Sequence, residues 1–192
     1  FNPEKAEAII QGGTFPSYPE DYRNEFIMYM FKAMNDFSSL FYEDNELNFN
    51  KFKEFFMLPR DMNDDDKTLE VKNKILNLKS ASLLELEQEK NELSKIRCTL
   101  LCIETKPDCC FESHINDMLN IGTTRVELGL QTIYNDILKK TNRGHTNEDT
   151  IKSIQLLKDS FLKTGLHVMP GLPSSNHDLD VNVFKELFNN QN

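Results

Sequence analysis

The sequence lacks several features that would assign it to a common class of protein. No apolar run approaches the roughly 18 residues that span a bilayer, and the first residues show no basic region followed by an apolar stretch. Positive charge is also in deficit, because 22 Lys and Arg residues stand against 31 Asp and Glu, for a formal net charge of -9. These absences argue against a membrane protein, and against a phosphate-binding surface built by this segment alone.

Cysteine is scarce and confined to one stretch. Cys98, Cys102, Cys109 and Cys110 lie within thirteen positions, and they are the only four cysteines in the sequence. So few thiols in a chain of this length do not indicate a secreted disulfide framework, and their spacings match no standard zinc or iron-sulfur pattern. We therefore predict a reducing compartment and no metal bound by these cysteines.

What the chain does contain is enough for a folded core. It has 192 residues, 39% of them hydrophobic and 14 of them Phe, which suits one domain or part of a larger one. The first residue is Phe rather than Met, and an apolar segment begins within five residues of it. We therefore expect an excerpt of a longer protein.

Short apolar segments alternate with helical patterns along the chain. We predict strands at residues 6–11, 98–104, 125–131 and 166–169, and helices after residue 19, at 111–121, from 146 onward and around 179–188. Four β-α units in this order predict an α/β fold with a parallel sheet, either open or curved into a barrel. In both forms ligands gather at the carboxyl ends of the strands.

The alternation is interrupted between the first and second units. We divide the chain into a first β-α unit at 1–35, an acidic and mainly helical insertion at 36–96, and three further β-α units at 97–192. Within the insertion, leucines recur at spacings of seven and three (69, 76, 83, 86 and 93), which predicts a helix or a helical hairpin. A solvated helical spacer is the favoured interpretation, and a coiled coil that binds a partner is the alternative.

One face of the predicted strands is polar, although parallel strands buried on both faces should be apolar. Glu104, Glu127 and Gln131 fall in this phase, with His167 as a weaker addition. If the sheet curves into a barrel, these side chains point toward a ligand. The alternative is that Glu127 pairs for structural reasons with an arginine, either Arg125 or Arg143.

Two loops add candidate binding groups. Gly12, Gly13 and Thr14 follow the first strand, where they let the backbone approach a ligand and present N–H groups to an anionic end. An ordinary turn is the simpler explanation, since no G-x-G-x-x-G or Walker pattern is present. Later, a basic group of two lysines, Arg143 and His145 suits a phosphate or a cofactor carboxylate; the lysines equally suit a helix end.

Several motifs occur together and in the order found in one enzyme family. They are GGTF at 12–15, CIETKPD at 102–108, TRVELGLQTIY at 124–134, TNRGHT at 141–146 and MPGLP at 169–173. With these motifs the chain resembles the catalytic subunit of the Elongator complex, over about 5–34 and 97–188. That family is a radical S-adenosylmethionine (SAM) enzyme fused to an acetyltransferase-like domain.

The resemblance implies a fold and an activity. The fold is a partial (β/α)6 radical SAM barrel, of which this chain supplies four consecutive units. The activity is carboxymethylation of carbon 5 of the wobble uridine of tRNA, using acetyl-CoA and a SAM-derived radical; the family is also described as a lysine or histone acetyltransferase. The implied partners are tRNA and other Elongator subunits, with no membrane, and the implied location is the cytoplasm, with the nucleus as a second site.

The resemblance also implies cofactors and their contacts. The cofactors are SAM, acetyl-CoA and a [4Fe-4S] cluster whose cysteine ligands lie outside this chain. The implied contacts are Gly12, Gly13 and Thr14 with the amino group of SAM, Glu104 with its methionine end, Gln131 and Arg143 with its ribose and carboxylate, and Lys5 with acetyl-CoA. No catalytic side chain and no metal ligand is assigned within the chain.

Two other functions remain open at this point. One is a different radical SAM enzyme of the oxygen-independent coproporphyrinogen oxidase type, which shares the Gly-Gly-Thr loop. The other is a cluster-less scaffold or tRNA-binding module in a larger assembly, with the acidic insertion meeting partner subunits. The run from Asn142 to Thr146 favours the Elongator resemblance over the first of these.

Overall fold

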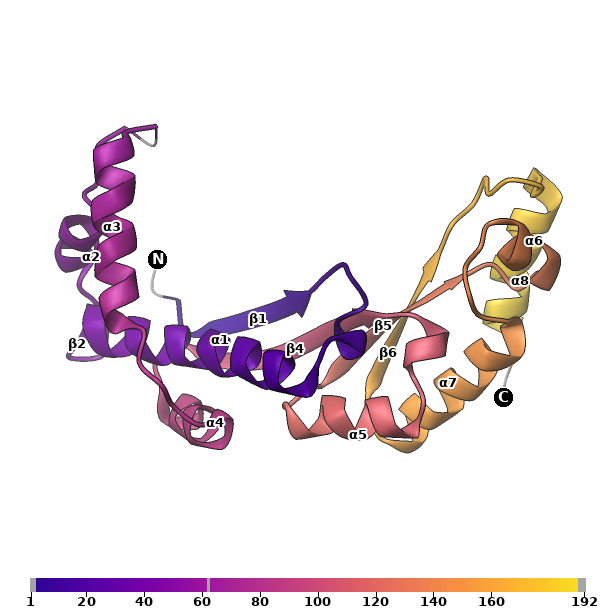
Figure 1. The fold of residues 1–192 in the computed structure, drawn as a ribbon, viewed down its shortest axis with the longest axis horizontal. Helices are drawn as coiled ribbons and strands as arrows, with labels where there is room; N and C mark the ends of the chain where they lie inside the picture. Colours follow the sequence, from indigo (N-terminus) through magenta and orange to yellow (C-terminus); the bar gives the residue numbers. More distant parts are fainter. Residues whose placement is uncertain (1–2, 62, 190–192) are drawn as a thin grey trace. The chain divides into compact units, whose positions relative to one another are not determined.

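The computed structural model describes residues 3–61 and 63–189, which divide into two compact units. We call the first, residues 3–7 and 20–99, the helical unit, and the second, residues 8–19 and 100–189, the sheet unit. Strands β1 (Lys5–Ile10) and β4 (Arg97–Thr105) each begin in the helical unit and end in the sheet unit (Figure 1).

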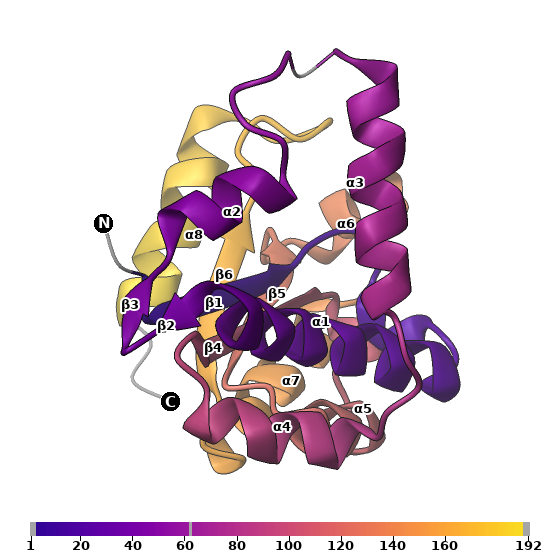
Figure 2. The same cartoon turned by 90° about the vertical axis from the view of Figure 1, so that its left-hand side faces the viewer.

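Four helices and a short hairpin build the helical unit. They are α1 (Glu20–Phe41), β2 (Tyr42–Glu43), β3 (Glu46–Leu47), α2 (Phe49–Phe55), α3 (Asp65–Leu78) and α4 (Leu84–Leu93). Local capping sets two of the starts, because Asn48 accepts the Lys51 N–H before α2 and Asp64 accepts the Lys67 N–H before α3. Figure 2 shows α3 standing across the direction of α1.

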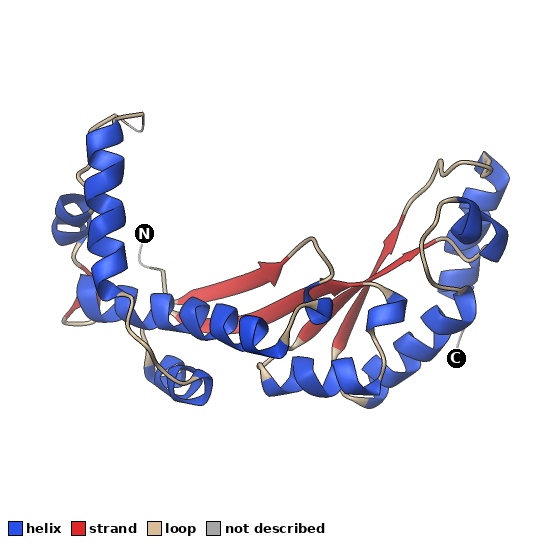
Figure 3. Ribbon diagram, in the orientation of Figure 1, coloured by secondary structure: helices blue, strands red, loops and turns tan. Residues whose placement is uncertain are grey.

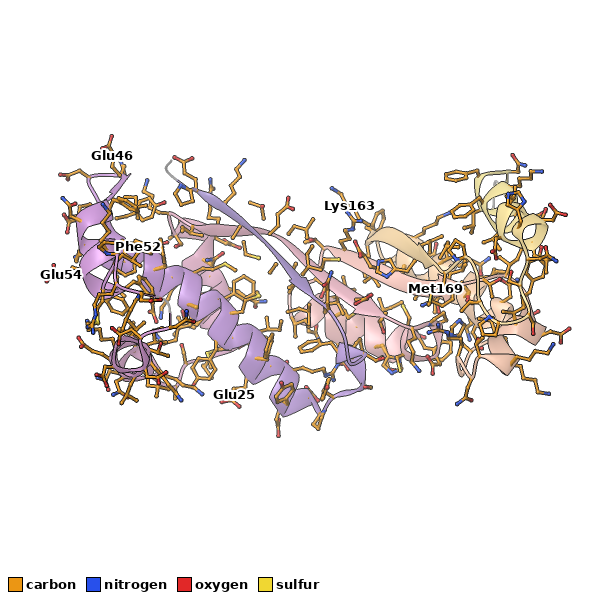
Figure 4. The ribbon with its side chains drawn as sticks, turned by 90° about the horizontal axis from the view of Figure 1, so that it is seen from above. Glu25, Glu46, Phe52, Glu54, Lys163 and Met169 are labelled. Carbon is orange, nitrogen blue, oxygen red and sulfur yellow. The ribbon has the colours of Figure 1, made fainter. Side chains whose placement is uncertain are left out.

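Aromatic rings join α1 to α2. Phe37 and Phe41 come from α1, and Phe52, Phe55 and Phe56 come from α2 and the residue after it; neighbouring ring centroids lie between 4.8 and 5.9 Å apart. Most of these pairs are tilted or edge-on, which are favourable arrangements for aromatic rings. Packing of phenylalanine rings therefore holds α1 and α2 together. Figure 4 labels Phe52 and Glu54 on α2.

A buried carboxylate joins α4 to α1. Glu87 is 2% exposed, and its oxygens accept hydrogen bonds from Asn35 (2.9 Å), Ser82 (2.6 Å) and Lys90 (2.9 Å). Burial opposes ionisation of Glu87, but these three donors outweigh it, so the pKa of the carboxyl falls to about 2. Asn91 continues the network, donating to Asn35 at 2.9 Å.

The leucine-rich part of the predicted insertion is helical, as its spacing predicts. It forms two helices, α3 and α4, with residues 79–83 between them. The five leucines themselves are all exposed: Leu69, Leu76, Leu83, Leu86 and Leu93. Helix α1 runs past the predicted boundary at residue 35 to Phe41, and its buried side chains include Ile27 and Phe31. The hairpin β2–β3 was not predicted, and the division into barrel and insertion stays a prediction.

A four-stranded sheet in the order β1-β4-β5-β6 is the centre of the sheet unit (Figure 3). Strand β5 (Arg125–Gln131) pairs in parallel with β4 on one side and with β6 (Lys163–Val168) on the other. The helices are α5 (Glu112–Asn120), α6 (Asn135–Lys140), α7 (Asn147–Asp159) and α8 (His177–Asn189), with 3-10 turns at Phe15–Ser17 and Pro107–Cys109. The predicted α/β fold with a parallel sheet is confirmed.

Helices α5 and α7 lie against one face of this sheet, as Figures 1 and 2 both show. The core between them includes Ile103, Val126, Leu128 and Met118, each buried. Since successive side chains of a strand alternate between faces, the neighbours of Val126 and Leu128 along β5 project from the opposite face. The helices thus bury one face and leave the other to the polar residues.

One prediction about the helices of this unit is wrong in part, and one helix was missed. The helical spacing of Ile151, Ile154, Leu157 and Phe161 predicts that these four side chains form the buried face of α7. Leu157 is buried, but Ile151 is 47% and Phe161 is 96% exposed, and Thr150 and Ser153 are buried in their place. Each of these hydroxyls has an acceptor, such as Pro107 O for Ser153. Helix α6 lies where no helix was predicted.

The sequence also predicts Thr146 as the N-cap of α7, because Asp149 follows three residues later. The Asp149 N–H donates to the Thr146 hydroxyl, which confirms this cap.

Along the described residues, no helix combines the length and the apolar character that a bilayer crossing requires.

Candidate functional site

The loop after β1 reaches the carboxyl end of β4 through a hydrogen bond. The Gly12 N–H donates to Glu104 Oε2 at 3.1 Å. Gly12, Gly13 and Thr14 all have positive φ, at 80°, 67° and 52°, a conformation that glycine adopts readily and Thr rarely. Gly13 also has no room for a side chain, because an added Cβ would lie 2.8 Å from the Tyr18 hydroxyl. The loop and Glu104, which were both candidates for ligand contact, thus touch each other within the sheet unit.

His167, on β6, bridges two carboxylates. Its Nδ1 lies 3.0 Å from Glu104 Oε1, and its Nε2 lies 2.7 Å from Glu127 Oε2. Glu104 and Glu127 are register partners on β4 and β5, so they stand side by side on one face of the sheet. The structure therefore joins Glu104, Glu127 and His167 in one cluster, as the polar phase of the strands predicted.

An arginine completes this cluster. Arg125 Nη2 lies 2.9 Å from Glu127 Oε1, so the structural pairing of Glu127 with Arg125 is confirmed as well. Gly165 on β6 makes room for the pair, because a Cβ there would lie 3.2 Å from Arg125 Nη2 and 3.3 Å from Glu127 Cγ. A chain of contacts thus runs from Glu104 through His167 and Glu127 to Arg125.

Gln131 and Arg143 both contact Met169, near the carboxyl ends of β5 and β6. The Met169 N–H donates to the Gln131 carbonyl at 2.9 Å, and Arg143 Nη2 lies 2.9 Å from Met169 Sδ. Figure 4 labels Met169 just after β6 and Lys163 where β6 begins. Met169 thus links the two predicted binding residues.

Several buried polar atoms at these strand ends have no hydrogen-bond partner within the part of the chain that the structure describes. They include Gln131 Oε1, Thr132 Oγ1, Arg143 Nε and His145 Nδ1. Gln131 has a positive φ of 67°, and Gly129 leaves the space for its amide, since a Cβ there would lie 2.7 Å from Gln131 Nε2. A buried polar group without a partner is costly. This end of the sheet is therefore arranged for a polar ligand.

The remaining predicted residue is not placed at this site. Lys5 is the first residue of β1, is exposed, and belongs to the helical unit. The contact predicted between Lys5 and acetyl-CoA stays a prediction.

Sequence reasoning underrated two residues. His167 was only a weak candidate, and Met169 was not a candidate at all. The signal for His167 was available, because it falls in the polar phase at the end of the fourth predicted strand. The signal for Met169 was not, since a methionine after a strand has no special meaning until its neighbours are known.

The cysteines do not gather into a metal site. All four are free, Cys102 and Cys110 are buried, and burial raises the pKa of the Cys110 thiol to about 12. Across residues 3–61 and 63–189, no three His, Cys, Asp or Glu side chains are placed to hold a metal ion.

An apolar cavity lies elsewhere, in the helical unit. Its volume is about 430 Å³, and it lies among α1, α2 and α3, where its lining includes Tyr29, Phe37, Phe56 and Ile75. It contains none of the predicted site residues, so its chemistry is separate from that of the strand ends.

Comparisons with known proteins identify relatives of this chain. The chain is 43% identical over 187 residues to a protein of Methanocaldococcus infernus named tRNA uridine(34) acetyltransferase, covering 97% of this chain and 27% of that relative. It is 34% identical to Elongator complex protein 3 of Dictyostelium discoideum (98% and 26%) and 33% identical to the human protein of that name (97% and 26%). The chain thus spans about a quarter of the length of these curated relatives.

The fold also matches a solved structure. The archaeal Methanocaldococcus infernus Elp3 with an N-terminal deletion (1-46) superimposes with a TM-score of 0.73 at 41% identity, over 97% of this chain and 34% of the other. The model of the Radical SAM superfamily matches residues 2–182. Since that match covers nearly the whole chain, the protein belongs to the radical SAM superfamily.

Proposed function

We propose that this chain is the SAM-binding part of an Elongator-type catalytic subunit, which carboxymethylates carbon 5 of the wobble uridine in tRNA from acetyl-CoA. The observation that carries the proposal is the set of unpartnered polar atoms on Gln131 and Arg143, near the strand ends where the Gly12 loop meets Glu104. The names of the relatives, which include tRNA uridine(34) acetyltransferase and Elongator complex protein 3, support the substrate and the reaction.

SAM fits the donors and acceptors at these strand ends. Its carboxylate suits the Arg143 guanidinium, which presents its Nε without a partner and can form a paired contact. Its ribose hydroxyls suit Gln131 Oε1, an acceptor that lacks a donor. Its amino group suits the Gly12–Thr14 loop and the Glu104 carboxylate, which keeps acceptor capacity beyond its two contacts with Gly12 and His167.

The cluster that the superfamily implies does not fit the cysteines of this chain, which are too dispersed to hold it. We propose that a [4Fe-4S] cluster is held by ligands outside these residues. With one electron from that cluster, bound SAM would be cleaved to methionine and a 5′-deoxyadenosyl radical, which would supply the hydrogen-abstracting chemistry. The role of this chain is to bind and orient SAM and to exclude water, because in cofactor enzymes the protein supplies position and electrostatics.

Further assignments belong to the same proposal. Acetyl-CoA is the second substrate, with Lys5 as its contact, and the activity extends to acyl transfer to lysine as an alternative acceptor. The partners are tRNA and other Elongator subunits, and the location is the cytoplasm, with the nucleus as a second site. The names of the relatives support the acetyl donor and the tRNA and Elongator partners. The Lys5 contact, the lysine acceptor and the location rest on the family resemblance alone.

The test uses the full-length protein that carries this segment, with its cluster reconstituted without oxygen. The proposal predicts that SAM is cleaved to 5′-deoxyadenosine in a reaction that depends on acetyl-CoA, and that tRNA then contains carboxymethylated uridine, detected by nucleoside mass spectrometry. SAM cleavage that ignores acetyl-CoA would favour a different radical SAM enzyme. Binding of tRNA without any SAM binding would favour the scaffold function.

A matched pair of variants ties the reaction to this site. Glu104→Gln removes the charge next to the loop, whereas Glu186→Gln makes the same change at an exposed position of α8. We expect SAM affinity to fall roughly ten-fold in the first variant, the effect of weakening one hydrogen bond to a charged group, and to stay unchanged in the second. Equal affinities in both variants would contradict the assignment of Glu104.

A further inference from the structure

We infer that His167 is a positioning residue of the SAM site: by bridging Glu104 and Glu127, it holds the Glu104 carboxylate in the orientation that fixes the Gly12–Thr14 loop. This inference deepens the proposed function and rests on it for the identity of the ligand. The bridge itself rests on contacts within the sheet unit and needs no ligand.

The first support is the geometry of the bridge. Each ring nitrogen of His167 faces a carboxylate oxygen, at 3.0 Å for Glu104 and 2.7 Å for Glu127. An ionised carboxylate only accepts hydrogen bonds, so both contacts are satisfied together when both ring nitrogens carry hydrogen. The other Glu104 oxygen accepts the Gly12 N–H at 3.1 Å. One carboxylate therefore connects the histidine to the loop.

The second support is the charge balance around the bridge. Glu104 and Glu127 are register partners on neighbouring strands, which lie roughly 4.8 Å apart in a sheet. Like charges at this spacing repel, and the groups that face them in the described contacts are His167 and Arg125, of which Arg125 touches Glu127 alone. Without His167, Glu104 has no side-chain donor in this cluster and is expected to turn toward solvent, away from the Gly12 N–H.

The third support is that β5 and β6 are shaped for this cluster. Gly165 lies opposite Glu127 in the register of β6, and any side chain there would crowd Arg125 and Glu127. His167 is 39% exposed at its side chain and Glu127 is 16% exposed. The bridge is therefore half-buried at the open face of the sheet, where it can influence a ligand without being enclosed in the core.

Hydrogen-deuterium exchange of the full-length protein tests the bridge without any ligand. We expect His167→Ala to speed exchange in the peptide spanning residues 8–19 by roughly ten-fold, since losing a charge-assisted hydrogen bond has an effect of this size. His177→Ala is the matched control, because His177 is exposed on α8, and it should leave that peptide unchanged. Unchanged exchange in His167→Ala would overturn the inference.

A charge rescue separates positioning from simple packing. We expect His167→Ala to weaken SAM binding roughly ten-fold and the double variant His167→Ala with Glu127→Gln to recover most of the loss, because Glu127→Gln removes the repulsion that displaces Glu104. A purely structural role for the ring would leave the double variant as weak as the single one, and that result would overturn the inference.

A third variant covers the case in which alanine disturbs the sheet. Gln at position 167 can donate to one carboxylate but presents a carbonyl to the other, so His167→Gln should give intermediate exchange and intermediate SAM affinity. If the wild-type protein binds no SAM, the proposed function fails, while the exchange comparison still decides the bridge. Wild-type behaviour of both His167→Gln and His167→Ala would overturn it.

Discussion

The Glu87 network of the helical unit and the strand ends of the sheet unit differ in how their buried polar groups are satisfied. In the helical unit, Glu87 is buried and both of its carboxylate oxygens accept hydrogen bonds, from Asn35 on α1 and from Ser82 and Lys90 beside it. In the sheet unit, Gln131 and Arg143 each present a buried atom that has no partner. A satisfied network specifies and rigidifies a fold, whereas an unsatisfied one indicates a missing ligand. The Glu87 network is satisfied by residues of its own unit, whereas the strand ends present polar atoms that suit the SAM we propose as their ligand.

Removing the Glu87 carboxylate gives the largest expected effect on the helical unit. Glu87→Ala removes the acceptor of Ser82 and Lys90 and one of the two acceptors of Asn35, which keeps only the Glu87 backbone carbonyl. We therefore expect α4 to open more readily by on the order of 3 kcal/mol. Hydrogen exchange of peptides from α4 in the full-length protein measures this. Glu89→Ala, at an exposed position of the same helix, should have almost no effect. Equal exchange of the α4 peptides in both variants would mean that the Glu87 hydrogen bonds do not stabilise α4.

Acid should produce a related loss in the same unit. The folded-state pKa of Glu87, about 2, lies below its ordinary value of 4.5. Its stabilisation is therefore fully present above pH 4.5, and it is lost as the pH falls toward 2. We expect the free energy of unfolding of the wild type to fall by up to roughly 3 kcal/mol between pH 4.5 and pH 2 because of this group.

The variant Glu87→Gln isolates this titration from that of other carboxylates. Acid unfolding followed by circular dichroism should show the difference in stability between wild type and Glu87→Gln shrinking as the pH falls from 4.5 to 2. A difference that stays constant over this range would contradict the lowered pKa.

In the sheet unit, the largest expected effect is on ligand affinity rather than on stability. Arg143→Ala should weaken SAM binding by roughly 10- to 100-fold, the range for a hydrogen bond between charged groups. Arg97→Ala, at an exposed position, is the matched control. Equilibrium dialysis on the full-length protein measures both. A SAM affinity in Arg143→Ala that equals that of Arg97→Ala would remove Arg143 from the site.

A smaller effect is expected where the sheet leaves space for Gln131. The Cβ of Gly129→Ala would meet Gln131 Nε2 at 2.7 Å, but that amide is the end of a flexible side chain and can move. We expect SAM affinity to fall only a few-fold, on the order of 1 kcal/mol, with little change in thermal stability. A large loss of stability without any change in affinity would mean that Gly129 serves the fold instead.

The smallest effect is expected at the exposed leucines. Leu93 is 92% exposed, so Leu93→Ala should change the stability of α4 by less than about 0.5 kcal/mol. Hydrogen exchange of α4 peptides in the full-length protein checks this. A destabilisation several times larger would mean that another chain or segment covers the leucines, which is the coiled-coil alternative to a solvated spacer.

The strands were predictable because alternation with a period of two is a local signal. The third predicted strand has the observed bounds, and the others differ by one to three residues at their ends. Helix α6 and the β2–β3 hairpin were missed because short elements carry too few periods to be recognised. The face of α7 was misjudged because hydrogen bonding, and not hydropathy, makes Thr150 and Ser153 fit the interior.

The candidate site was predictable to the extent that strand ends collect ligands. Glu104, Gly12 and Glu127 were candidates because of their positions along the strands. In the structure Glu104 accepts the Gly12 N–H and lies beside Glu127. The unpartnered atoms of Gln131 and Arg143 were not predictable, since whether a polar group has a partner depends on contacts distant in sequence. The polar phase of its strand makes His167 a candidate, but its bridge was not predictable, because the two carboxylates lie 63 and 40 positions away.

Hydrogen exchange of the full-length, cluster-containing protein with and without SAM tests the central claim most directly. The account predicts that SAM protects peptides from residues 8–19, 100–110 and 125–146 and leaves those from α3 and α4 unchanged. Protection confined to the helical unit, or no protection at these strand ends while SAM is bound, would contradict it.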